Sequence, residues 1–195
     1  MRPGLVLARR LAGLGVLPML TSTAVKASCT MAATACAAAL GIGSAAAQSA
    51  DYSRLPVDPN SITDSLAYTA APLAINPDGQ PGVKAEYTHR EGGTRQITTT
   101  ILVLADPAAA TAALDGAAAD VVNQHSQPAD VGTGGTMVTG TSPDGSESVA
   151  VLTFTEGNTA TTIEFEGPPN DPAPADLVTE LGQKQAAAIK TWQTA

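Results

Sequence analysis

The sequence predicts an α+β domain in which an antiparallel, meandering sheet carries helices on one face. Stretches of alternating apolar and polar residues, typical of half-buried strands, recur between residues 84 and 166. Short turn sequences rich in Gly, Asn and Asp separate them, and such turns make hairpins instead of parallel crossovers. Helical patterns follow the hairpins near residues 107 and 172, so the strands do not alternate singly with helices.

The first segments of the mature domain carry weak signals. Residues 48–60 are polar and contain two prolines, so we interpret them as a flexible entry. Asn60 or Ser61 can cap a short helix that ends near residue 67. The next segment, 71–82, is rich in proline and surrounds a short strand at 73–75.

The clearest hairpin comes next. Residues 84–90 alternate between apolar and polar side chains, and a Glu-Gly-Gly turn follows them. Residues 96–104 form the strongest predicted strand, and its second half is apolar on both faces, as in a central strand covered by a helix. Asp106-Pro107 has the residue types of a helix start, so we expect an alanine-rich helix from there to about residue 124.

The same order recurs in the second half. Residues 136–141, 147–155 and 159–166 predict a three-strand meander joined by Pro-Asp-Gly and Gly-Asn turns. Asp171-Pro172 then opens a closing helix whose apolar residues fall on one broad face. Both halves therefore contain a hairpin, an Asp-Pro step and a helix. A β-β-α duplication is one explanation of this order, and chance recurrence of common units is the other.

The first 47 residues have the composition of a secretory signal peptide. They carry four basic side chains and no acidic one, whereas the rest of the chain carries six basic and all 18 acidic side chains. An uncharged Ala- and Gly-rich stretch ends in Ala45-Ala46-Ala47, which fits the A-x-A cleavage rule. We therefore expect a cut between Ala47 and Gln48, a flexible entry at 48–60, and a single domain at 61–195 that is secreted or held in the cell envelope.

Alternative interpretations exist for the translation start of this leader and for its processing. A start at Val25, followed by Lys26, shortens an unusually long peptide, and the other interpretation is a long leader with 11–20 as its apolar core. An uncleaved anchor would be short and weakly apolar for a membrane span. Cys36 lacks the preceding leucine of a lipoprotein box, so we expect cleavage without lipid attachment and no stable membrane span.

Cysteine position and charge exclude several classes of function. Both cysteines, Cys29 and Cys36, lie in the leader, so the mature chain has no disulfides, thiol nucleophiles or thiolate metal sites. Six basic against 18 acidic residues give the mature chain an excess of negative charge, which argues against nucleic-acid binding.

Catalytic and metal-binding motifs are weak throughout. His89 and His125 are too few and too isolated for a zinc site, and we interpret them as structural residues. The segment 132–135 resembles a phosphate loop but lacks the following lysine and leads into a strand. Ser146 and Ser148 lie in a hairpin without a Gly-x-Ser-x-Gly elbow. We therefore predict no catalytic residue, no cofactor and no metal.

Carboxylate pairs leave one chemical alternative open. Glu86 with Glu91, or Glu164 with Glu166, could lie close enough for acid–base hydrolysis, although a solvated strand face is the simpler interpretation. Asn170-Asp171 and Asp176 could contribute to a calcium site, but helix capping explains both aspartates.

A core built from small apolar residues and few aromatics can leave room for a ligand. Four aromatic residues are the ones we expect beside such a pocket, and ordinary core packing is the alternative for each of them. These residues are Tyr87, Phe154, Phe165 and Trp192.

Several motifs resemble those of a known group of domains. The strand-to-helix step at 101–107 with its alanine run, the turn at 154–158 leading into 161–165, and the closing helix are similar to the exported sensor-like domains of actinobacterial, including mycobacterial, lipoproteins and receptor kinases. The resemblance implies a curved antiparallel sheet with helices and a ligand cleft. It supplies no catalytic residue.

We therefore expect a secreted, non-enzymatic, sensor-like module from a GC-rich actinobacterium that binds an apolar ligand or a cell-envelope partner. The first alternative is an acidic structural or interaction protein of the envelope without a ligand pocket, and the second is a carboxylate-dependent hydrolase. An enclosed apolar cavity above about 300 Å³ favours ligand binding, and a filled core favours interaction. A hydrolase requires a cleft with two carboxylates of raised pKa.

Overall fold

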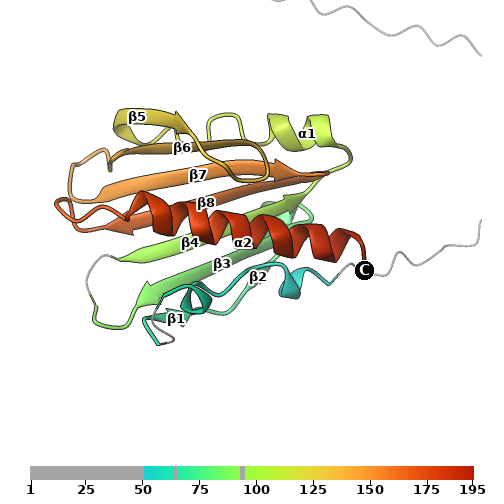
Figure 1. Ribbon diagram of the computed structural model, residues 1–195, viewed down its shortest axis with the longest axis horizontal. Coiled ribbons are helices and arrows are strands. Elements are labelled where there is room, and N and C mark those ends of the chain that lie inside the picture. The colour runs from blue at the N-terminus through green and yellow to red at the C-terminus, as the bar shows by residue number, and fades with distance from the viewer. Residues whose placement is uncertain (1–50, 64–65, 93–94) are drawn as a thin grey trace, which may run out of the picture. The chain divides into compact units, whose positions relative to one another are not determined.

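The computed structural model describes residues 51–195 apart from 64–65 and 93–94, so the predicted leader, the Val25 start and the Ala47–Gln48 cut lie outside the described residues. Eight strands of the described chain form one antiparallel sheet, in the order β1-β3-β4-β8-β7-β6-β5 with β2 paired to β3 (Figure 1). The strands are β1 Tyr68–Ala70, β2 Ala74–Ile75, β3 Gly82–His89, β4 Gln96–Val103, β5 Val122–Pro128, β6 Thr133–Thr141, β7 Ser148–Glu156 and β8 Thr159–Gly167. The predicted α+β class with an antiparallel meander is confirmed.

The middle of the sheet joins the two halves of the domain. β4 pairs with β8 in a register that sets Ile97 opposite Phe165 and Ile101 opposite Thr161. The hairpins β3–β4 and β7–β8 are therefore neighbours, and a helix follows each, in the order that the duplication hypothesis describes. The helices differ in length, because α1, Pro107–Ala112, has six residues and α2, Ala175–Gln193, has 19.

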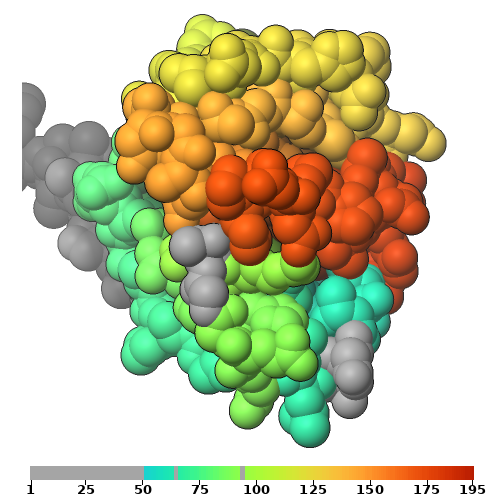
Figure 2. Space-filling view, turned by 90° about the vertical axis from the view of Figure 1, so that its left-hand side faces the viewer, coloured from blue at the N-terminus to red at the C-terminus, as the bar shows by residue number. Residues whose placement is uncertain are grey.

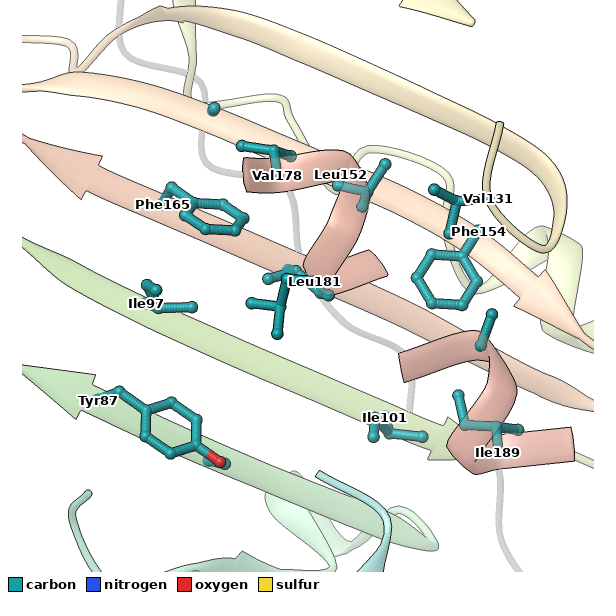
Figure 3. Close-up of a cluster of buried hydrophobic side chains, with 14 of the residues drawn as sticks. Tyr87, Ile97, Ile101, Val131, Leu152, Phe154, Phe165, Val178, Leu181 and Ile189 are labelled. Atoms are coloured by element: carbon teal, nitrogen blue, oxygen red, sulfur yellow. The ribbon is translucent and has the colours of Figure 1, made fainter. Parts of the chain in front are cut away.

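The main core lies between α2 and one face of the sheet (Figure 3). Val178, Leu181 and Ile189 of α2 are fully or almost fully buried against apolar side chains of the strands, Leu152 of β7 among them. Gly182 lets the helix approach closely, since a Cβ atom there would collide with the side chain of Leu152. This packing, and not intrinsic helix propensity, holds α2 on the sheet.

The segment 51–60, which the sequence indicated as a flexible entry, is held against this core. Leu55 is fully buried, and Gln185 of α2 hydrogen-bonds to the backbone of Leu55 and Val57. A short 3-10 turn, Pro59–Ser61, capped by Asp58, lies where the sequence predicted the start of a helix, and the described residues 62–63 and 66–67 are not helical. Asn60 does not cap it, because its side-chain amide bonds to both backbone groups of Tyr68 and so fixes the start of β1.

The alanine-rich helix is much shorter than the sequence predicts. Asp106 caps α1 through a 2.8 Å hydrogen bond from the N–H of Ala109, as expected, but the helix ends at Ala112. Turns follow to residue 120, and Gly116 in that stretch has φ +79°, a left-handed conformation that interrupts a helix. The connection then crosses the sheet, and Ala118 and Val121 pack on the face opposite α2.

The start of α2 also differs from the prediction. The helix begins at Ala175 after Pro174, and its first turn has no side-chain cap. Asp171, the expected cap, forms an ion pair with Arg95 at the start of β4. Figure 2 looks at this end of the molecule, where the orange-red chain leading into α2 lies between the yellow-orange strands of the second half and the green β3–β4 hairpin.

Candidate functional site

The four aromatic residues predicted to lie beside a ligand all belong to the core region. Phe154 of β7, Phe165 of β8 and Tyr87 of β3 are 0%, 3% and 5% exposed and belong to the main core cluster (Figure 3). Trp192 is half-buried at the edge of this cluster, and its ring centroid lies 5.9 Å from that of Tyr52. The cavity that Phe165 lines has a volume of about 30 Å³, which is room for a water molecule and not for an apolar ligand.

Tyr87 has the electrostatic character of a core residue. Burial, with a smaller contribution from the charge of Asp58, raises the pKa of Tyr87 to about 12. Its phenol therefore remains protonated at neutral pH, and the ring contributes apolar area to the core.

The opposite face of the sheet is only partly covered. β7 is buried on both faces over 148–152, because Ala118 and Val121 pack against Val149 and Val151. β3, β4 and β8 instead alternate between buried and half-exposed residues over most of their length. We call their second surface the open face; it comprises Lys84, Glu86, Thr88, Gln96, Thr98, Thr100, Thr162, Glu164 and Glu166.

A pocket of about 280 Å³ lies at the border between the open face and the covered part of the sheet. Glu164 and Glu166 of β8 line it together with Asp120 of the crossing segment. Its remaining walls are mostly small or apolar: Ala117, Ala118, Val121, Ser142, Pro143 and Val149. We call this cavity the acidic pocket.

Both glutamates of the acidic pocket have a raised pKa. Burial raises the pKa of Glu164, and the nearby charges of Asp120 and Glu147 add to this effect. Burial also raises the pKa of Glu166, followed by the charges of Glu164 and Glu147. Lys84 opposes both shifts, but its ammonium already pairs with Glu86 at 2.7 Å. Both carboxyl groups are therefore harder to ionise than a solvent-exposed glutamate.

The sequence indicated Glu164 and Glu166 as a carboxylate pair, and the structure places both on one cavity. Asp120 was not foreseen, because it comes from a segment predicted to be helical. Glu86 lies two strands away, opposite Thr98, which is in turn opposite Glu164. Glu91 lies in the turn after β3 and not in the acidic pocket.

The other candidate residues lie in strands and a turn, where their contacts are part of the fold. His89 contacts the ring of Tyr68 edge-on at 5.2 Å, and His125 lies on the exposed edge strand β5. The hydroxyl of Ser146 donates to Asp144, which also accepts from Ser142, so both groups belong to the hairpin turn. Over residues 51–195, the described part of the chain contains no group of three or more His, Cys, Asp or Glu that could hold a metal ion.

An open depression of about 800 Å³ lies at the start of the described chain. Tyr52, Ile75 and Asn76 are among the residues that line it. Asp51, on its rim, already accepts hydrogen bonds from the N–H and hydroxyl of Ser53, which lower its pKa. The depression is therefore wide and open to solvent, and the carboxylate of Asp51 on its rim already has hydrogen-bond partners.

Known proteins offer no guide to this site. No family model, no curated protein and no solved structure matches the chain. Among the described residues, no helix is long and apolar enough to cross a membrane. What the protein does is therefore inferred from its own side chains.

Proposed function

We propose that the protein is an exported, non-enzymatic domain that recognises a cell-envelope partner through its surface. The observation that carries this proposal is the filled core: Phe154, Phe165 and Tyr87 are buried in one apolar cluster, and the space beside Phe165 is about 30 Å³. An internal apolar site needs a cavity roughly ten times larger. Of the two binding functions that the sequence suggests, the geometry favours surface interaction.

The charge of the chain supports the location that we propose. The four basic residues of the first 47 precede a domain that carries all 18 acidic residues, which is the asymmetry of an exported protein with a removable leader. A strongly acidic surface keeps such a domain soluble and steers it toward basic partners.

Native mass spectrometry of the protein purified from culture medium tests this function. We expect a chain that begins at Gln48 and carries no bound small molecule. Chemical cross-linking on intact cells should then join the domain to a polypeptide partner through its surface lysines. A stoichiometric apolar molecule in the native spectrum, or a lipid on Cys29 or Cys36, would overturn the proposal.

A second candidate function is carboxylate-dependent hydrolysis, and the acidic pocket favours it. Glu164 and Glu166 line one cavity and both have a raised pKa, which is a property of general acids. The test is turnover of a panel of nitrophenyl glycosides. Hydrolysis is supported if the native protein turns over a substrate, E164Q and E166Q do not, and the control D130N/E180Q still does. Equal background rates in the native protein and all variants would exclude hydrolysis of these substrates.

A further inference from the structure

We propose that the open face of the sheet is the docking surface for a lysine- or arginine-rich segment of the partner polypeptide. This inference rests on the proposed function and names the chemistry of the partner. The open face is a continuous surface of three adjacent strands, because Glu86 of β3 lies opposite Thr98 of β4, and Thr98 lies opposite Glu164 of β8.

Charge complementarity identifies the occupant. Glu86, Glu164 and Glu166 lie on the open face. The charge of Glu147 acts on both glutamates of β8, and the charge of Asp120 acts on Glu164. Lys84 is the cation that the described strands place among them, and it pairs with Glu86 at 2.7 Å. Five carboxylates and one lysine give this surface an excess of negative charge, which is complementary to a basic partner.

The shape of the acidic pocket fits the side chains of lysine and arginine. Its apolar walls, Val121 and Val149 among them, can cover the methylene stem, while Glu164 and Glu166 receive the charged end. A positive group in the acidic pocket would also reduce the electrostatic repulsion between these two carboxylates more than water in the pocket does.

Strand spacing favours a polypeptide over a small polyamine. Glu164 and Glu166 are two residues apart on one strand, so their Cα atoms are about 7 Å apart along it. Alternate side chains of an extended peptide have the same spacing, about 7 Å. Basic residues at positions i and i+2 of such a peptide can therefore meet both glutamates, while Thr98 and Thr162 offer hydroxyls beside it.

The test uses the full chain and an octalysine peptide at physiological ionic strength. Amide shifts in NMR spectra should change in β3, β4 and β8, and E164Q/E166Q should weaken binding about tenfold, since each glutamate contacts a basic side chain. The control is D130N/E180Q, which removes two charges from exposed residues and should weaken binding less than twofold. Melting temperatures of both variants establish that they are folded.

Two results would overturn the docking surface. One is equal weakening by the two variants, because binding would then follow net charge alone; the other is a set of shifts confined to α2. A carbodiimide cross-link from octalysine to Glu86, Glu164 or Glu166 supports the proposal, and cross-links confined to other carboxylates contradict it. If a cell-envelope partner cross-links only through Lys184 and Lys190 of α2, the open face is wrong while the proposed function stands.

Discussion

The side-chain amide of Gln185 donates a 2.7 Å hydrogen bond to the backbone carbonyl of Leu55, which precedes it by 130 residues. Its oxygen also accepts a 2.8 Å hydrogen bond from the N–H of Val57. Gln185 is 1% exposed and Leu55 is fully buried. One polar side chain therefore satisfies two backbone groups of the entry segment and attaches that segment to α2.

Replacing Gln185 by leucine should destabilise the protein. The buried carbonyl of Leu55 would lose its hydrogen bond without a replacement, and the N–H of half-buried Val57 would also lose its partner, at a cost of about 2–4 kcal/mol in the free energy of unfolding. Gln183→Leu is the control, because Gln183 is exposed and its 3.0 Å bond to the carbonyl of Asp130 can be replaced by water. Chemical denaturation measures both, and equal losses would contradict an anchoring role for Gln185.

Two glycines with similar backbones should respond differently to alanine. Gly132 and Gly145 both have positive φ, at +50° and +71°. A Cβ atom at Gly132 would lie 2.7 Å from the ring of Phe154 and 2.7 Å from the carbonyl oxygen of Thr155, whereas the space beside Gly145 is open. We expect Gly145→Ala to cost about 1 kcal/mol for backbone strain, and Gly132→Ala to cost at least twice as much. Thermal unfolding of both variants measures these losses, and a larger loss for Gly145→Ala than for Gly132→Ala would contradict the prediction.

Replacing two buried threonines of β8 by valine should change the stability of the protein in opposite directions. Among the described residues, the fully buried hydroxyl of Thr161 has no hydrogen-bond partner, so Thr161→Val should stabilise the fold by about 1 kcal/mol. The hydroxyl of Thr159 donates to the carbonyl of Glu156 at 2.7 Å, so Thr159→Val should destabilise by a similar amount. Urea titration of both variants tests the signs; destabilisation by Thr161→Val would reveal a hydrogen bond to that hydroxyl.

Stability should depend on pH through the acidic pocket. Burial, then Asp120 and Glu147, raises the pKa of Glu164 above its ordinary 4.5, and burial, then Glu164 and Glu147, raises that of Glu166; Lys84 opposes both shifts. The folded state therefore binds more protons than the unfolded state above pH 4.5. This contribution is fully present below the unfolded pKa and is lost as pH rises through the folded values.

The double variant E164Q/E166Q isolates that contribution. We expect it to melt at a higher temperature than the native protein near pH 8, because it removes two carboxylates whose charged forms the fold disfavours. The difference should shrink toward zero below the ordinary glutamate pKa, where the native side chains are neutral. Calorimetry over this range measures it, and a difference that does not change with pH would show that these carboxylates titrate normally.

The aromatic residues should behave as packing residues. Phe154 is fully buried, so Phe154→Ala should cost about 3–5 kcal/mol of unfolding free energy. Trp192 is only half-buried, and Trp192→Ala should cost clearly less. A small effect of Phe154→Ala together with uptake of an apolar probe by the wild-type core would instead favour a ligand pocket.

Alternation and turn chemistry predicted the strands at the centre of the sheet. β3, β4 and β8 have one apolar face each, and this periodicity is present in the sequence because it reflects one buried face per strand. β5 has no such pattern, since all seven of its residues are exposed and only pairing with β6 makes it a strand. An edge of this kind carries no local apolar signal.

The alanine-rich segment after β4 misled the prediction for a different reason. Its small residues fit a helical stripe, but Gly116 breaks the helix and the chain must cross from β4 to the far edge of the sheet. That crossing creates the acidic pocket, by bringing Asp120 beside Glu164 and Glu166. The site therefore depends on tertiary topology, which the local sequence does not contain.

The pairing of β4 with β8 has a kinetic consequence. Neighbouring strands of the central sheet come from opposite halves of the polypeptide, and α2, the last element, closes the core above them. Contacts between distant parts of a chain form slowly, because loop-closure entropy must be overcome first. The protein therefore cannot complete its native core until the residues of α2, its last element, have been synthesised.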